Sequence, residues 1–204
     1  MAEFTFDAAS HTYLLDGARL PSVTEIISPI RQDFSMIGAE VLEAKRALGT
    51  AVHLACEFDD LGELDDAETD SKIMGYVHAW RKFKSDTSAI ILFNEQRMYH
   101  EVLRFAGTVD RVAALELSGA LDTWIIDIKT SEEAHPSYGV QLAGYALLLE
   151  AFERINWTKH VKHNRASVHL RSDGTYRMHR YQQHIDESAF RACLALNHWK
   201  ETTK

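Results

Sequence analysis

The run Trp124–Thr130 constrains this chain most, because it is apolar except for two charged residues and its last threonine. Such a run predicts a buried strand. Side chains two positions apart on a strand point to the same face, so Asp127 and Lys129 project together. Burying two charges costs several kcal/mol per ion unless something compensates for the lost hydration. A structural ion pair could do so, and so could a metal ion bound by the carboxylate, in which case this strand carries an active site.

Apolar residues recur at helical spacing in other parts of the chain, as Ile73, Val77 and Trp80 do. We predict helices over residues 38–60, 70–85, 137–153 and 186–201. Near the N-terminus, Ser22 followed by Glu25 predicts a capping box at the start of a further helix.

The middle of the chain changes to the period of strands, which we predict over residues 90–93, 104–114 and 123–129. Asp173-Gly174 indicates the turn of a hairpin formed by residues 167–170 and 176–179. The segment Phe4–Leu15 also has the pattern of a hairpin, with a turn signal at Asp16-Gly17. Helices, strands, a helix, a hairpin and a helix in this order predict an α/β sandwich built on a mixed sheet.

The length of 204 residues suits one domain, and 46% hydrophobic with 25% charged residues is ordinary for a soluble globular protein. No apolar stretch approaches a membrane span, and the N-terminus lacks the regions of a signal peptide, so we expect a cytoplasmic protein. Two cysteines, Cys56 and Cys193, cannot supply the four thiolates of an ordinary iron–sulfur cluster. The net charge of −8 argues against a general nucleic-acid coat protein, although a local basic groove stays compatible with it.

Several residues elsewhere could complete a site around Asp127. Asp110, in Gly107-Thr108-Val109-Asp110, is an acid on the strand expected to neighbour that of Asp127, and two such carboxylates suit Mg²⁺ or Mn²⁺. His53 follows a patch of small residues, Gly49-Thr50-Ala51-Val52, that lets a helix approach a sheet, and Glu57 shares its helical face. Taken alone, each has a structural explanation, as an edge acid or a core histidine.

Gln141 and Tyr145 are four apart on one helical face, where an amide and a hydroxyl could contact a phosphate backbone. Alone, they would be an ordinary helix face. Arg111 follows Asp110 directly, and the basic residues Lys159, Lys162, Arg165 and Arg171 come after the long helix. These could attract DNA or be scattered solvated charges.

In this order the four motifs resemble the RecB-like branch of the PD-(D/E)XK nuclease superfamily. The motifs are Gly-x-x-x-His (Gly49 to His53), Gly-x-Val-Asp (Gly107 to Asp110), Asp-x-Lys-Thr (Asp127 to Thr130) and Gln-x-x-x-Tyr (Gln141 to Tyr145). The opening Leu20-Pro21-Ser22-Val23-Thr24 is similar to the start of phage-type exonucleases and of the mitochondrial genome maintenance exonuclease, which belong to this branch.

The resemblance implies a restriction-endonuclease-like core with a central four-stranded mixed sheet flanked by helices, an N-terminal hairpin, and a C-terminal hairpin plus helix. One nuclease domain would span residues 1–204, with an N-terminal extension (1–37), a catalytic core (38–155) and the C-terminal hairpin and helix (156–204).

The resemblance also implies roles for individual residues. His53, Asp110, Asp127 and the backbone carbonyl of Ile128 would bind one or two Mg²⁺ or Mn²⁺ ions. Asp110, Asp127 and Lys129 would be catalytic, with Lys129 as the catalytic lysine. Gln141 and Tyr145 would bind DNA, and Glu95 would have a secondary role. By their positions alone, Arg111 is a further candidate for DNA binding and Glu57 a further secondary candidate.

The expected function is that of a metal-dependent DNA exonuclease in phage or bacterial recombination or repair. A PD-(D/E)XK endonuclease, a non-catalytic DNA-binding module on the same fold and an unrelated metal-dependent phosphoesterase are the alternatives. DNA is the expected partner, and a single-strand annealing protein is a further one by analogy. Strand polarity, strand preference and oligomeric state have no legible signal in the sequence.

Overall fold

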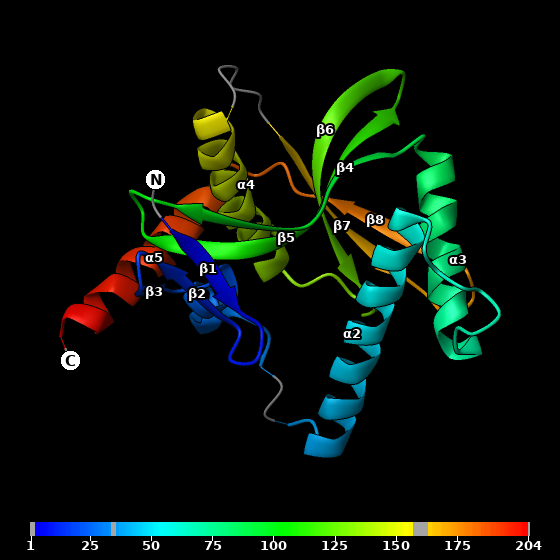
Figure 1. The fold of residues 1–204 in the computed structure, drawn as a ribbon, viewed down its shortest axis with the longest axis horizontal. Coiled ribbons are helices and arrows are strands. Elements are labelled where there is room, and N and C mark those ends of the chain that lie inside the picture. The colour runs from blue at the N-terminus through cyan, green and yellow to red at the C-terminus, as the bar shows by residue number, and fades with distance from the viewer. Residues whose placement is uncertain (1–2, 34–35, 157–162, 204) are drawn as a thin grey trace.

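A computed structural model gives the structure of residues 3–33, 36–156 and 163–203. Its centre is a five-stranded sheet in the order β4-β5-β6-β7-β8 (Figure 1). Neighbouring strands are antiparallel except for β6 and β7, which are parallel. The strands are β4 (Ile90–His100), β5 (Phe105–Leu117), β6 (Ala120–Lys129), β7 (Asn164–Leu170) and β8 (Tyr176–Arg180).

Helices cover both faces of this sheet, which makes an α/β/α arrangement of three layers (Figure 1). On one face lie α4 (Ser137–Asn156), α5 (Ile185–Thr202) and the short α1 (Val23–Ile26). On the other face lie α2 (Ala39–Leu61) and α3 (Ser71–Asp86). The predicted α/β class with a mixed sheet is therefore confirmed.

The sheet has one strand more than the four that were expected, because the C-terminal hairpin joins it. Asp127 pairs with Ser167 and Lys129 with His169, so the strand that carries the buried charges has a neighbour on each side. A central strand has all its backbone groups paired and both faces covered, which explains its apolar composition. The predicted turn at Asp173-Gly174 connects β7 and β8, with Gly174 at a φ of +81°.

The N-terminal segment forms a separate three-stranded sheet rather than the predicted hairpin. Its strands are β1 (Phe4–Asp7), β2 (Thr12–Leu15) and β3 (Ala18–Leu20). Asp16-Gly17 does form a turn, with both residues at positive φ, but the chain beyond it pairs back as β3. The capping box of α1 is confirmed: Ser22 Oγ accepts from Glu25 N at 3.1 Å, and Ser22 N donates to Glu25 Oε2 at 2.8 Å.

The other helices begin and end close to their predicted bounds. Asp70 caps α3 by accepting from Lys72 N at 2.8 Å, and Gly62 ends α2 in the left-handed conformation that glycine adopts without strain. A short 3-10 turn (Ser28–Ile30) follows α1. Within the described ranges, none of the helices has the length and apolar composition that crossing a membrane requires.

Candidate active site

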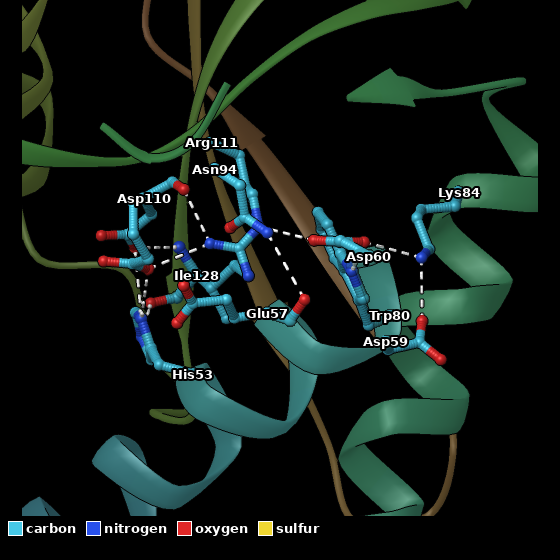
Figure 2. A network of polar contacts seen from close by, with 11 residues as sticks. His53, Glu57, Asp59, Asp60, Trp80, Lys84, Asn94, Asp110, Arg111 and Ile128 are labelled. Atoms are coloured by element: carbon cyan, nitrogen blue, oxygen red, sulfur yellow. Dashed lines mark hydrogen bonds and ion pairs between the residues drawn. The ribbon is translucent and has the colours of Figure 1, made fainter. Parts of the chain in front are cut away.

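Asp110 on β5 and the β6 segment around Asp127 meet near the middle of the sheet. Asp110 Oδ2 accepts a hydrogen bond from the backbone N–H of Ile128 at 2.9 Å (Figure 2). This contact joins the second and third sequence motifs directly. The expectation that these acids lie on neighbouring strands is confirmed by the antiparallel pairing of β5 with β6.

His53 reaches this point from α2. Its Nε2 lies 2.9 Å from the backbone carbonyl oxygen of Ile128 (Figure 2). A carbonyl oxygen only accepts, so Nε2 carries the proton and donates. The other ring nitrogen, Nδ1, lies 3.5 Å from Asp110 Oδ2 and 4.0 Å from Glu95 Oε1. In the neutral imidazole, Nδ1 therefore offers its lone pair on the side of the two carboxylates.

These three side chains form a donor set that suits a divalent cation. His53, Glu95 and Asp110 each offer one ligand atom, and the three atoms lie within 4.8 Å of one another. Carboxylate oxygens are the ligands that hard divalent cations prefer, and an imidazole nitrogen is a common ligand of first-row transition metals. Glu95 ranked only as a secondary candidate from the sequence, yet the structure places it in the central group.

The backbone at Glu95 is unusual for a strand residue. Its φ is +46°, the left-handed region that residues other than glycine rarely adopt. It lies on β4 between the paired positions Asn94 and Gln96, opposite Asp110. Such strained positions cost roughly 1–3 kcal/mol and concentrate at functional sites.

Asp127, a predicted ligand, is occupied by other partners in this structure. Lys129 Nζ lies 2.6 Å from Asp127 Oδ2, and Gln141 Nε2 donates to Asp127 Oδ1 at 3.3 Å. The predicted convergence of Asp127 and Lys129 on one face is confirmed. Asp127 is outside the three-residue ligand group, and the Ile128 carbonyl, also a predicted ligand, accepts from His53. The Asp127 carboxylate and the Ile128 carbonyl are therefore still only predicted as metal ligands.

The acids and the lysine shift one another's pKa values because they are poorly hydrated. Burial and the charge of Asp110 raise the pKa of Glu95 to about 7, against the opposing effect of Arg111. Burial likewise raises the pKa of Asp127, although Lys129 opposes the shift. Burial alone would lower the pKa of Lys129, but Asp127 and Asp110 outweigh it and raise that pKa. Lys129 is therefore an ammonium at neutral pH.

Gln141 and Tyr145 on α4 are buried rather than displayed to a DNA strand. Gln141 Nε2 donates to Tyr145 Oη at 3.1 Å as well as to Asp127. These contacts hold the Asp127 carboxylate in place from the α4 side of the sheet. Gly107 on β5 makes this possible, because a Cβ there would lie 3.1 Å from the Tyr145 ring. Glycine allows α4 and β5 to approach closely.

Arg111 does not occupy the DNA-facing position that was predicted, and we correct that assignment. It is 0% exposed, and its guanidinium donates to Asp60 Oδ2 at 2.6 Å and to Glu95 Oε1 at 3.0 Å. Successive residues of a strand face opposite sides, so the neighbour of Asp110 points toward α2 and α3. Glu57, the other secondary candidate, is outside the ligand group, and its backbone carbonyl accepts from Asn94 Nδ2 at 3.4 Å.

The basic stretch after the long helix is described only in part. Lys159 and Lys162 lie outside the described residues. Arg165 is partly buried and bonds to the Gly139 carbonyl at 3.0 Å and to Asp186 at 3.2 Å. Arg165 is therefore paired with the Asp186 carboxylate of α5.

A cavity of about 180 Å³ opens beside the ligand group. Part of its wall comes from the N-terminal segment, which sequence reasoning did not place at the site. The lining residues are His11, Tyr13, Ser22, Val23, Thr24, Glu95, Gly107, Thr108, Asp110 and Tyr145. A nucleotide approaching the ligand group from this side would meet hydroxyl and imidazole groups.

Comparison with known families agrees with this geometry. The chain matches the PD-(D/E)XK nuclease superfamily over residues 69–195, more than half of its length. The match includes Glu95, Asp110, Asp127, Lys129 and Gln141. No curated protein matches the sequence. The chain therefore belongs to the PD-(D/E)XK nuclease superfamily, whose members are metal-dependent nucleases, and DNA is the substrate that this membership implies.

Proposed function

We propose that this protein is a RecB-like DNA exonuclease that hydrolyses phosphodiester bonds with Mg²⁺ or Mn²⁺, in phage or bacterial recombination or repair. The observation that carries the proposal is the convergence of His53, Glu95 and Asp110 within 4.8 Å, next to the Asp127–Lys129 ion pair. A purely structural cluster would not need an acid-rich site with a lysine at its edge.

The proposed ligands are His53, Asp110 and Glu95, with Asp127 and the Ile128 carbonyl as further donors once substrate is present. A divalent ion held by these residues would lower the pKa of a bound water and stabilise charge on a scissile phosphate. His53 is fixed for this role by its Nε2–H bond to Ile128, because that bond determines which ring nitrogen keeps a lone pair. Asp110 is fixed in the same way by the Ile128 amide.

Lys129 is the proposed catalytic lysine. Its ammonium lies at 2.6 Å from Asp127 and 4.8 Å from the centre of the Tyr138 ring, so its position is well defined. A protonated lysine cannot act as a base. We propose that it orients the attacking water and offsets the negative charge that develops on the phosphate.

The exonuclease assignment is supported by the place of the opening motif. Ser22, Val23 and Thr24, in the segment that resembles phage-type exonucleases, line the cavity beside Asp110 and Glu95. The motif is therefore at the candidate site rather than on a remote surface. A cavity wall formed by these residues suits a DNA strand that ends near the proposed metal ligands.

The decisive test is digestion of three labelled DNA substrates in Mg²⁺ and in Mn²⁺: linear duplex, linear single strand and covalently closed circle. We expect degradation of a linear substrate, complete inhibition by EDTA, and an intact circle. Cleavage of the circle would identify an endonuclease instead. Binding of DNA without cleavage in either metal would identify a non-catalytic module.

A generic phosphatase substrate provides the last arm of the test. Hydrolysis of that substrate with no DNA cleavage would overturn the nuclease proposal in favour of a small-molecule phosphoesterase. Lys129→Ala is the matched inactive control, since it removes the ammonium without removing any proposed metal ligand.

A further inference from the structure

A chain of alternating charges leads from the surface of α3 to the candidate metal site. It begins with Arg81 on α3, which lies 2.5 Å from the Asp59 carboxylate on α2, and Asp59 lies 2.8 Å from Lys84. Lys84 is also 2.7 Å from Asp60, and Asp60 is 2.6 Å from Arg111 (Figure 2). The chain of charges ends at Glu95, which lies 3.0 Å from Arg111 and 4.0 Å from His53.

The centre of this chain of charges is fully buried, so each charged group depends on its partners. Arg111 is 0% exposed and the Asp60 side chain 1% exposed, so neither charge has water to replace a lost partner. The planar guanidinium donates through Nε to Asp60 and through a terminal nitrogen to both Glu95 and the Asp110 carbonyl. A planar guanidinium with these three acceptors has little freedom to turn.

Glu95 is also held from its backbone side. Its φ of +46° departs from the extended backbone of a regular strand, so the alternation of side chains along β4 is interrupted at this position. The side chain then lies between Arg111 and the ligand atoms of His53 and Asp110. Two independent features, the strained backbone and the buried cation, therefore act on the same carboxylate.

We propose that Asp60 and Arg111 are positioning residues, which hold the carboxylate of the proposed ligand Glu95 toward His53 and Asp110. Asp60 is not part of the ligand group, yet the affinity for the metal depends on it through Arg111. This inference rests on the proposed metal site and names what orients one of its ligands.

A purely structural role of the same network makes a different prediction. If Asp60 and Arg111 only attach α2 to the sheet, breaking the pair lowers stability and leaves the metal affinity of the folded protein unchanged. If they orient Glu95, metal affinity falls, and the fall disappears once Glu95 itself is removed. The second outcome is a non-additive double-mutant cycle, which a structural role does not produce.

The test is isothermal titration of the full chain with Mn²⁺, comparing wild type, Asp60→Asn, Glu95→Gln and the double variant. Asp60→Asn should weaken binding by roughly 10- to 100-fold, the range for groups that orient metal ligands, and Glu95→Gln, which removes a proposed ligand, should weaken it at least as much. The double variant should bind no more weakly than Glu95→Gln alone. Wild-type affinity in folded Asp60→Asn or in Glu95→Gln, or additive losses in the double variant, would overturn the proposal.

Asp59→Asn is the matched control, because Asp59 belongs to the same network but does not contact Arg111. It should lower the unfolding temperature and leave the Mn²⁺ affinity as in wild type. A loss of affinity equal to that of Asp60→Asn would show a general effect of the helix contact and would overturn the inference. Failure of the wild type to bind Mn²⁺ would instead refute the proposed function.

Arg111→Lys keeps the comparison available if Asp60→Asn does not fold. Lysine retains the positive charge, but its single ammonium cannot reproduce the fork that bridges Asp60, Glu95 and the Asp110 carbonyl. We expect weaker Mn²⁺ binding in Arg111→Lys and no further loss when Glu95→Gln is added. Unchanged affinity in Arg111→Lys would contradict the positioning role.

Discussion

Replacing Lys129 by methionine should separate the chemical role of the lysine from its structural one. Methionine keeps much of the volume of the side chain and removes the ammonium that lies 2.6 Å from Asp127. Asp127 is 2% exposed, so the substitution leaves a buried carboxylate whose remaining hydrogen-bond donor, among the residues that the structure describes, is the Gln141 amide. Removing one partner of a buried ion pair costs about 3–5 kcal/mol.

We take about 3 kcal/mol, the lower end of that range, because Gln141 still donates and Asp127 can take up a proton. For a protein of this length, each kcal/mol lowers the unfolding temperature by roughly 2–4 °C, so the expected loss is roughly 6–12 °C. Thermal unfolding of metal-free protein at pH 7 measures it. The double variant Lys129→Met/Asp127→Asn removes both charges and should recover most of the loss.

Activity should behave differently from stability in these two variants. Both should fail to cleave DNA, while folded Lys129→Met should still bind Mn²⁺ through its retained carboxylates. Full nuclease activity in Lys129→Met would refute the catalytic role of the lysine. A double variant as unstable as the single one would refute the charge-burial argument, since it would place the cost in packing instead.

Three further predictions concern the surroundings of the site. Gly107→Ala should destabilise the protein by about 1–3 kcal/mol in urea unfolding, because the new methyl group would lie 3.1 Å from Leu148 and from the α4 tyrosine; unchanged stability would mean that α4 can shift. Gln141→Leu should lower the rate of DNA cleavage by roughly 10- to 100-fold with little change in fold, since Gln141 orients a proposed ligand; wild-type rates would exclude that role. Burial lowers the pKa of His169 below 6.5, despite its hydrogen bond to a backbone carbonyl. Its contribution to stability is thus present above pH 6.5 and is lost as the pH falls through the lower folded-state pKa. The free energy of unfolding of the wild type should therefore fall below pH 6.5 more steeply than that of His169→Gln, by up to about 1.4 kcal/mol per pH unit; parallel profiles would contradict this.

Local periodicity in the sequence predicted most of the secondary structure. The helical spacing of Ile73, Val77 and Trp80 and the apolar run around Asp127 each correspond to an element of the structure. The capping box of Ser22 is also present as predicted. These signals are local, because a helix or strand repeats its pattern within a few residues and caps act over one turn.

The pairing of strands that are far apart in the sequence was harder to predict. The third N-terminal strand and the addition of β7 and β8 to the main sheet depend on which edges meet, and that information is spread over distant segments. The strand β4 extends to His100, well beyond its apolar start, because β5 pairs with its polar half. Cross-strand pairing can override a weak local pattern.

Two acids, a histidine and a lysine are recognisable from the sequence alone, in an order and on elements that can form one site. Strand alternation and helical spacing predict which neighbours share a face, and the resemblance of the ordered motifs to the nuclease superfamily implied that they meet. Packing between distant segments brings Glu95 to His53 and Asp110 and buries Arg111 instead of exposing it to DNA. The reason is that alternation sends Arg111 to the face opposite Asp110, while only the packing of α2 and α3 decides whether that face meets water or the Asp60 carboxylate.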